Sequence, residues 1–196
     1  MKVQNIINIL TETVRPNYLY HSTTVSNALD IIDDQSINPK KSWGGKNDIP
    51  IVSMSRNSKL FYNNENYNNP EVQFVFDRDV LKMHFHSPTP TNWMKDSIYP
   101  YGSIPNELQS MNKNKAWEHK NKYEREEYLT KPIPTSPKFI EKIVIYQTAI
   151  QQKLDSLDED FPNYYHIKKR LERELKEDIP LLIDKINFLK IPLEII

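Results

Sequence analysis

The chain contains no cysteine and only three glycines among its 196 residues. Without thiols it cannot form disulfides, zinc ribbons or iron–sulfur clusters, and it has no cysteine nucleophile. A dinucleotide fingerprint needs the pattern G-x-G-x-x-G, and a P-loop ends in Gly-Lys followed by Ser or Thr. Gly44, Gly45 and Gly102 make neither pattern. Any nucleotide is therefore bound without a glycine-rich phosphate turn.

Net charge and long apolar runs are also lacking. The 26 Lys and Arg residues balance 26 Asp and Glu residues, which argues against strong nonspecific binding to duplex DNA. No apolar run reaches membrane-spanning length, and the N-terminal sequence has no secretory h-region. We therefore expect a soluble, cytoplasmic protein with no membrane partner. The Asn- and Lys-rich, Gly-poor composition is typical of an AT-rich genome and indicates a bacterial or phage-infected cell.

Short β-type segments dominate the first part of the chain. Apolar runs of β-formers predict strands at residues 18–21, 49–54, 72–76 and 139–146. Helical spacing of apolar residues predicts a helix over residues 25–32, with the preceding Ser and Thr residues as its cap. Loops and small helices separate the strands instead of regular crossover helices. This arrangement favours an α+β fold over a doubly wound parallel sheet.

The C-terminal residues differ in character. Leu and Ile recur at helical spacing with charged residues between them, which predicts a helical appendage at 151–196 after a domain at 1–150. We expect two helices there, broken near Pro180. The apolar ending at 191–196 is unusual for a free tail, so we expect it to dock on the domain or on a partner. A further short helix is expected at residues 3–14.

Three short segments place polar or ionisable residues at the end of an apolar β-like run. They are Leu-Tyr-His-Ser-Thr at 19–23, Pro-Ile-Val-Ser-Met-Ser-Arg-Asn-Ser-Lys-Leu-Phe-Tyr at 50–62, and Glu-Tyr-Leu-Thr-Lys-Pro-Ile-Pro at 127–134. A strand end can hold such a side chain rigidly at a cleft. In this order the segments resemble the ADP-ribosyltransferase superfamily. The resemblance is closest to the DarT-type enzymes, which modify thymidine in DNA, and it covers roughly residues 17–146.

The resemblance implies a split β-sandwich of two small antiparallel sheets with flanking helices, to which the C-terminal helical appendage is added. It also implies an enzyme that uses NAD as substrate, cleaves the nicotinamide–ribose bond and transfers ADP-ribose to a nucleobase in DNA. Two alternatives stay open. The acceptor could be a protein side chain, or catalysis could be lost and the fold could serve as a binding or assembly protein through its C-terminal helices.

The resemblance assigns Glu127 and Arg56 as the catalytic residues. Cleavage of the nicotinamide bond builds positive charge on the ribose, as in glycoside hydrolysis. A carboxylate such as Glu127 stabilises this charge and can take a proton from the acceptor. The guanidinium of Arg56 suits the pyrophosphate, since it is permanently charged and binds in a bidentate manner.

The same resemblance places NAD against residues of the first two segments. His21 is expected to bind a ribose hydroxyl, and an aromatic ring among Phe61, Tyr62 and Tyr67 is expected to stack on nicotinamide. The NAD-binding candidates are His21, Ser22, Thr23, Ser55 and Tyr62.

The charged residues allow several other interpretations. Glu124 and Glu126 form a Glu-x-Glu pattern that would resemble arginine-modifying transferases. The whole acidic run could equally be a solvated helix face, and Arg56 could pair with a nearby acid such as Asp77 or Asp79.

The remaining candidates concern metals and the acceptor. His84 and His86 would share one face of a strand expected there, but no third ligand has suitable spacing, so we expect no metal. The long Pro- and Asn-rich stretch at 86–122 is expected to face the acceptor. Lysines 40, 41 and 46, beside Gly44-Gly45, are expected to contact a nucleic-acid backbone.

Overall fold

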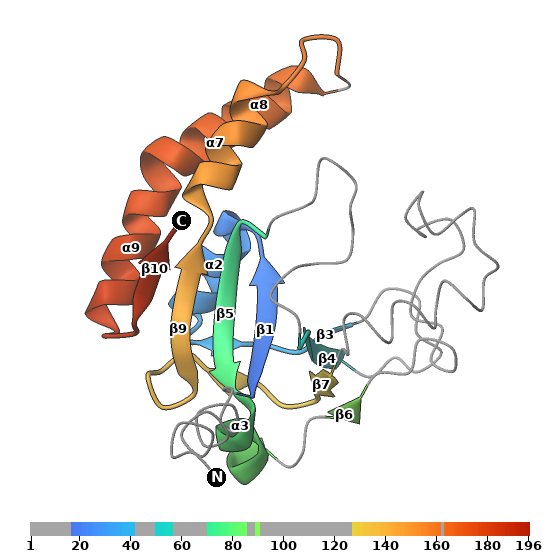
Figure 1. The fold of residues 1–196 in the computed structure, drawn as a ribbon, viewed down its shortest axis with the longest axis vertical. Coiled ribbons are helices and arrows are strands. Elements are labelled where there is room, and N and C mark those ends of the chain that lie inside the picture. Colours follow the sequence, from blue (N-terminus) through green and yellow to red (C-terminus); the bar gives the residue numbers. More distant parts are fainter. Residues whose placement is uncertain (1–16, 42–49, 57–69, 86–88, 91–126, 162) are drawn as a thin grey trace, which may run out of the picture.

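A computed structural model describes residues 17–41, 50–56, 70–85, 89–90, 127–161 and 163–196 (Figure 1). Helices and small sheets alternate along the chain, which confirms the predicted α+β class. The expected helix at 3–14, the loop around Gly44-Gly45 and Lys46, and all of the 86–122 stretch except residues 89–90 lie outside the described residues. No helix in the described ranges is long and apolar enough to cross a membrane.

The larger sheet has the strand order β1-β5-β9-β10. β1 pairs antiparallel with β5, and β5 pairs antiparallel with β9, whereas β10 pairs parallel with β9. The sheet is therefore mixed, which differs from the purely antiparallel sheet expected. Parallel pairing is possible because helices connect β9 to β10 and return the chain to the same end of the sheet. The four strands are β1 (Tyr18–Thr23), β5 (Val72–Asp77), β9 (Ile140–Ile145) and β10 (Leu193–Ile195).

Shorter strands form two further sheets. The four-stranded one has the order β3-β4-β7-β6, and β2 pairs with β8 in the other. The strands are β3 (Lys40–Lys41), β4 (Pro50–Met54), β7 (Glu127–Leu129), β6 (Thr89–Pro90), β2 (Ser36–Ile37) and β8 (Ile133–Pro134).

Among the residues that the structure describes, one isolated antiparallel bridge joins the two four-stranded sheets. Tyr20 of β1 donates its N–H to the Ser55 carbonyl at 2.8 Å, and the Ser55 N–H donates to the Tyr20 carbonyl at 2.9 Å. Because these are backbone bonds, they fix the distance between β1 and the end of β4 independently of either side chain. The strand ends that carry the first two sequence segments are thus side by side.

Helix α2 (Val25–Asp33) lies behind the larger sheet in Figure 1. As predicted, a hydroxyl residue caps it: the Thr24 side chain accepts a hydrogen bond from the Asn27 N–H at 3.2 Å. This cap satisfies one of the N–H groups that a helix leaves unpaired in its first turn. The helix buries an apolar face consisting of Val25, Ala28, Ile31 and Ile32.

Helix α3 (Arg78–Phe85) replaces the strand expected around His84. The Asp77 carboxylate accepts hydrogen bonds from the N–H groups of Asp79 and Val80, so it starts a helix where β5 ends. The prediction that His84 and His86 share one face of a strand is therefore wrong. His84 lies on α3, with its Nδ1 2.9 Å from the Val80 carbonyl oxygen, and His86 lies outside the described residues.

The C-terminal segment is helical as predicted, but its break lies elsewhere. α7 (Gln147–Asp155) ends well before α8 (Tyr164–Arg173), and α8 continues through a π-helical turn, η1 (Glu174–Asp178), into α9 (Ile179–Phe188). The helix passes Pro180 without a break because the π turn shifts the hydrogen-bond register, with the Ile179 N–H bonded to the Glu174 carbonyl.

The C-terminal helices dock on the rest of the chain. Their buried residues belong to the same apolar cluster as the sheet and α2, so no separate core begins at the boundary predicted after residue 150. The final strand adds backbone bonds from Ile143 N–H to the Pro192 carbonyl and from Ile196 N–H to the Ile145 carbonyl, each 2.9 Å long. The apolar ending is thereby tied into the larger sheet. The cluster members in this segment include Leu171, Ile179, Leu182, Ile186 and Ile191.

We expect Leu182→Ala to lower the free energy of unfolding of the whole protein by about 2–5 kcal/mol, because this fully buried side chain would leave a cavity. The neighbouring Leu181→Ala is the matched control, since Leu181 is 48% exposed and its loss should change stability by less than about 0.5 kcal/mol. Urea unfolding measures both. Equal, small losses would show that α9 does not share the core.

Candidate functional site

Glu127 is the first residue of β7 and only 3% exposed. It faces Met54 of β4 across the strand pair, and Val52 faces Leu129. Alternate residues of a strand share a face, so these four side chains lie on one side of the small sheet. The carboxylate of Glu127 thus stands at the end of an otherwise apolar buried stripe.

Two arginines hold this carboxylate. The Nε of Arg56 lies 2.5 Å from Glu127 Oε1, and the Nε of Arg78 lies 2.8 Å from Oε2. Arg56 follows β4 and Arg78 opens α3, so one acid joins both sheets and a helix. A buried carboxylate is costly unless opposite charges and hydrogen bonds compensate it, and the two guanidinium groups do so here. Arg56 pairs with Glu127 rather than with the Asp77 or Asp79 considered from the sequence.

Asn17, just before β1, contacts both arginines. Its side-chain oxygen accepts from Arg56 Nη1 at 3.4 Å, and its carbonyl accepts from the Arg78 N–H at 2.9 Å. Sequence reasoning missed both Asn17 and Arg78. The partner of Arg78 is distant in sequence, so no local pattern indicates this pairing. The one local signal for Arg78 was its position directly after a strand that ends in the helix-capping Asp77.

His21 lies on the other side of β4 from Glu127. Its Nδ1 is 2.9 Å from the carbonyl oxygen of Ser53, and its ring packs on Phe74 with centroids 6.3 Å apart. Burial lowers the pKa of His21 below its usual 6.5, although the Ser53 bond opposes this change. A carbonyl can only accept, so Nδ1 carries the proton, and Nε2 of the neutral ring is a hydrogen-bond acceptor.

The structure brings four of the predicted site residues around β4, namely His21, Ser55, Arg56 and Glu127. Ser55 is 7% exposed, and its backbone forms the bridge to β1. Five predicted candidates lie outside the described residues, namely Phe61, Tyr62, Tyr67, Glu124 and Glu126.

Asn17, Arg56, Arg78 and Glu127 are here called the Glu127 cluster. Ser22 and Thr23 lie apart from it. They line a cavity of about 700 Å³ that includes the start of α2 and residues of α7 and α8 but none of Asn17, Arg56, Arg78 or Glu127. Ser22 also points to the opposite face of β1 from His21, and its Oγ accepts from the Gln73 amide at 3.0 Å.

Comparisons of this chain with protein-family models, curated proteins and solved structures found no match. Within the residues that the structure describes, no group of three or more His, Cys, Asp or Glu side chains could hold a metal ion.

We expect Arg78→Met to lower the free energy of unfolding by about 2 kcal/mol, because it removes a charged hydrogen bond from a buried carboxylate. The matched control is Lys142→Met, which breaks the exposed ion pair between Lys142 and Glu194 and should cost less than about 1 kcal/mol. Chemical denaturation measures both variants. If the two losses were equal, Glu127 would not depend on Arg78.

The depressed pKa of His21 makes stability depend on pH. Since the unfolded chain binds a proton at His21 more readily than the folded one, the contribution of this group falls as pH decreases through 6.5 toward the folded pKa. We expect the wild-type protein to lose stability relative to His21→Gln when pH is lowered from about 7 to about 5. Thermal unfolding across this range measures the difference, and parallel curves would contradict the burial of a neutral imidazole.

Proposed function

We propose that this chain is an NAD-dependent ADP-ribosyltransferase that transfers ADP-ribose to a nucleobase in DNA. The supporting observation is the contact between Arg56 and Glu127, two residues that the sequence resemblance selected separately and that are 71 positions apart. Two four-stranded sheets joined at the Tyr20–Ser55 bridge are compatible with the split β-sandwich of that superfamily.

The chemistry assigns Glu127 the central role. Positive charge develops on the ribose as the bond to nicotinamide breaks, and a carboxylate in a poorly solvated site stabilises that charge more than one in water. The same carboxylate can then accept the proton that the acceptor nitrogen loses. Arg78 is a positioning residue, since its bond to Oε2 fixes the orientation of the carboxylate.

Arg56 is the residue we assign to the pyrophosphate. Its side chain is 30% exposed, twice as open as the 14% of Arg78, and it reaches Glu127 through Nε. When NAD binds, the guanidinium turns its remaining donors to the phosphate oxygens. Oε1 of Glu127 is held by Nε, and its second lone pair can accept a hydrogen bond from a ribose hydroxyl.

His21 supplies an acceptor on the opposite side of β4. With Nδ1 bound to the Ser53 carbonyl and the ring neutral, Nε2 can accept a hydrogen bond from a ribose hydroxyl. The NAD site in this proposal consists of His21, Arg56 and Glu127. Exposed Lys40 on β3, next to β4, suits a phosphate of the DNA acceptor.

A second candidate follows from the same contacts. Both oxygens of Glu127 are engaged by guanidinium groups, which is also what a purely structural ion pair between two sheets requires. In that case the fold serves as a binding or assembly protein. A protein side chain as acceptor is a further variant of the enzyme, and Glu124 and Glu126 would carry it.

Nicotinamide release from NAD, in the presence of single-stranded DNA that contains thymidine, distinguishes these candidates. We expect release by the wild-type protein and a loss of about a hundredfold or more in Glu127→Gln, because the carboxylate and its general-base function are removed. Arg56→Lys should raise the KM for NAD, since one ammonium cannot replace a bidentate guanidinium.

Glu141→Gln is the matched control, because Glu141 is an exposed carboxylate on β9 and should keep full activity. Unfolding midpoints recorded for each variant separate loss of chemistry from loss of fold. Absence of nicotinamide release and of NAD binding by the wild-type protein would favour the structural ion pair over the enzyme.

A further inference from the structure

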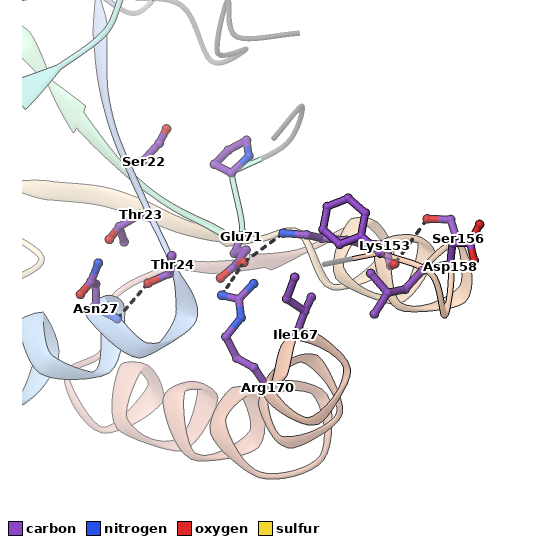
Figure 2. A pocket seen from close by; sticks show the side chains of 13 residues that line it. Ser22, Thr23, Thr24, Asn27, Glu71, Lys153, Ser156, Asp158, Ile167 and Arg170 are labelled. Carbon is purple, nitrogen blue, oxygen red and sulfur yellow. Dashed lines mark hydrogen bonds and ion pairs between the residues drawn. The ribbon is translucent and has the colours of Figure 1, made fainter. Parts of the chain in front are cut away.

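The cavity beside Ser22 and Thr23 lies where the larger sheet meets the C-terminal helices (Figure 2). Its volume of about 700 Å³ is in the range of sites that hold small organic ligands. It lies at the Thr23 end of β1, whereas Asn17 and its two arginines lie at the start of that strand. The cavity is therefore separate from the Glu127 cluster.

Positive charge converges on one carboxylate in this cavity. Figure 2 shows Lys153 of α7 and Arg170 of α8 pointing toward Glu71, with Arg170 Nη1 3.2 Å and Lys153 Nζ 3.9 Å from Glu71 Oε1. The other oxygen, Oε2, accepts from the Val25 N–H at 3.1 Å, at the positive end of α2. Glu71 is therefore paired with two cations and bonded to one backbone N–H, which offset its negative charge.

A second carboxylate behind Arg170 alters the charge balance. Glu174, in the π turn, is fully buried, and its Oε1 lies 3.3 Å from Arg170 Nη1. Its Oε2 has no hydrogen-bond partner among the described residues. Burial and the nearby Glu71 raise the pKa of Glu174 to about 7, and Asp178 adds to this while Arg170 and Lys153 oppose it. When Glu174 is protonated, Lys153 and Arg170 balance the two acids of the lining, Glu71 and Asp158, whereas ionised Glu174 leaves the acids in excess.

The rest of the lining suits a ligand with an apolar body. The lining includes Leu157 and Phe161, in the segment between α7 and α8, together with Ile167 of α8 and Pro70. Ser22, Thr23 and Thr24 add hydroxyl residues to the lining. Asp158 is an exposed acid in the lining.

We propose that this cavity is a second binding site, for a small organic anion that carries a carboxylate or phosphate group on an apolar or aromatic body. The anionic group contacts Lys153 and Arg170 near the start of α2. The body packs on Leu157 and Phe161. An occupant would link the C-terminal helices to the larger sheet, so it stabilises the folded protein. The site is independent of the proposed transferase function.

Calorimetry with phenyl phosphate, benzoate and inorganic phosphate tests the site directly. We expect phenyl phosphate and benzoate to bind more tightly than inorganic phosphate, which lacks the apolar body. Lys153→Gln should weaken benzoate binding about tenfold, because it removes one charge-assisted bond. Lys169→Gln is the matched control, since Lys169 is exposed on α8 and outside the lining.

A substitution that tightens binding distinguishes an effect on the site from a loss of folding. Asp158→Asn removes an acid from the lining and should tighten benzoate binding by about two- to fivefold. Glu159→Gln removes the neighbouring exposed acid, which is not part of the lining, and should leave binding nearly unchanged. Equal effects of the two substitutions would contradict a site at this cavity.

The pH dependence tests the role of Glu174. Protonation of this acid removes negative charge beside Arg170, so benzoate should bind more tightly at about pH 6 than at about pH 8. In Glu174→Gln we expect the tighter binding to persist at about pH 8.

Two results would overturn the proposal. Binding of phenethylammonium in place of benzoate would show that the cavity takes a cation through Glu71 and Asp158. An NAD affinity that falls in Lys153→Gln as much as benzoate binding does would make the cavity part of the NAD site instead of a second one. Failure of nicotinamide release alone would contradict the transferase and leave this site unaffected.

Discussion

The burial of one carboxylate decides how this fold is arranged. Glu127 ends an apolar stripe between β4 and β7, where an uncompensated charge would destabilise the protein by several kcal/mol. Arg56 and Arg78 must therefore be brought to it from the end of a strand and the start of a helix, and Asn17 holds both. The same constraint that joins two sheets also aligns a carboxylate, a guanidinium and, across β4, a neutral imidazole.

The C-terminal segment completes the larger sheet and at the same time creates the second cavity. Its buried leucines and isoleucines enter the common core, and β10 pairs with β9. Because α7 and α8 then stand over the start of α2, Lys153 and Arg170 reach Glu71 (Figure 2). The π turn at 174–178 carries the chain past Pro180 and buries Glu174 beside Arg170. The π turn therefore determines both the course of the helix and the position of the Glu174 carboxyl group.

Local patterns predicted the strands β1, β4, β5 and β9 and the helix α2 because each depends on its own apolar periodicity and turn residues. Helix α3 was missed, since the capping role of Asp77 depends on how β5 ends. Pairing of Arg78 with Glu127 could not be read from the sequence because the two are 49 positions apart. The prediction that Ser22 and His21 both bind NAD overlooked that neighbouring side chains of a strand point to opposite faces.

We propose that Glu127, Arg56 and His21 form a site that moves ADP-ribose from NAD to a base. Mass spectrometry of a thymidine-containing single-stranded oligonucleotide, after incubation with NAD and the purified protein, is the decisive measurement. We expect an oligonucleotide heavier by one ADP-ribosyl group, with the added mass on a base. An unmodified oligonucleotide and intact NAD would contradict it.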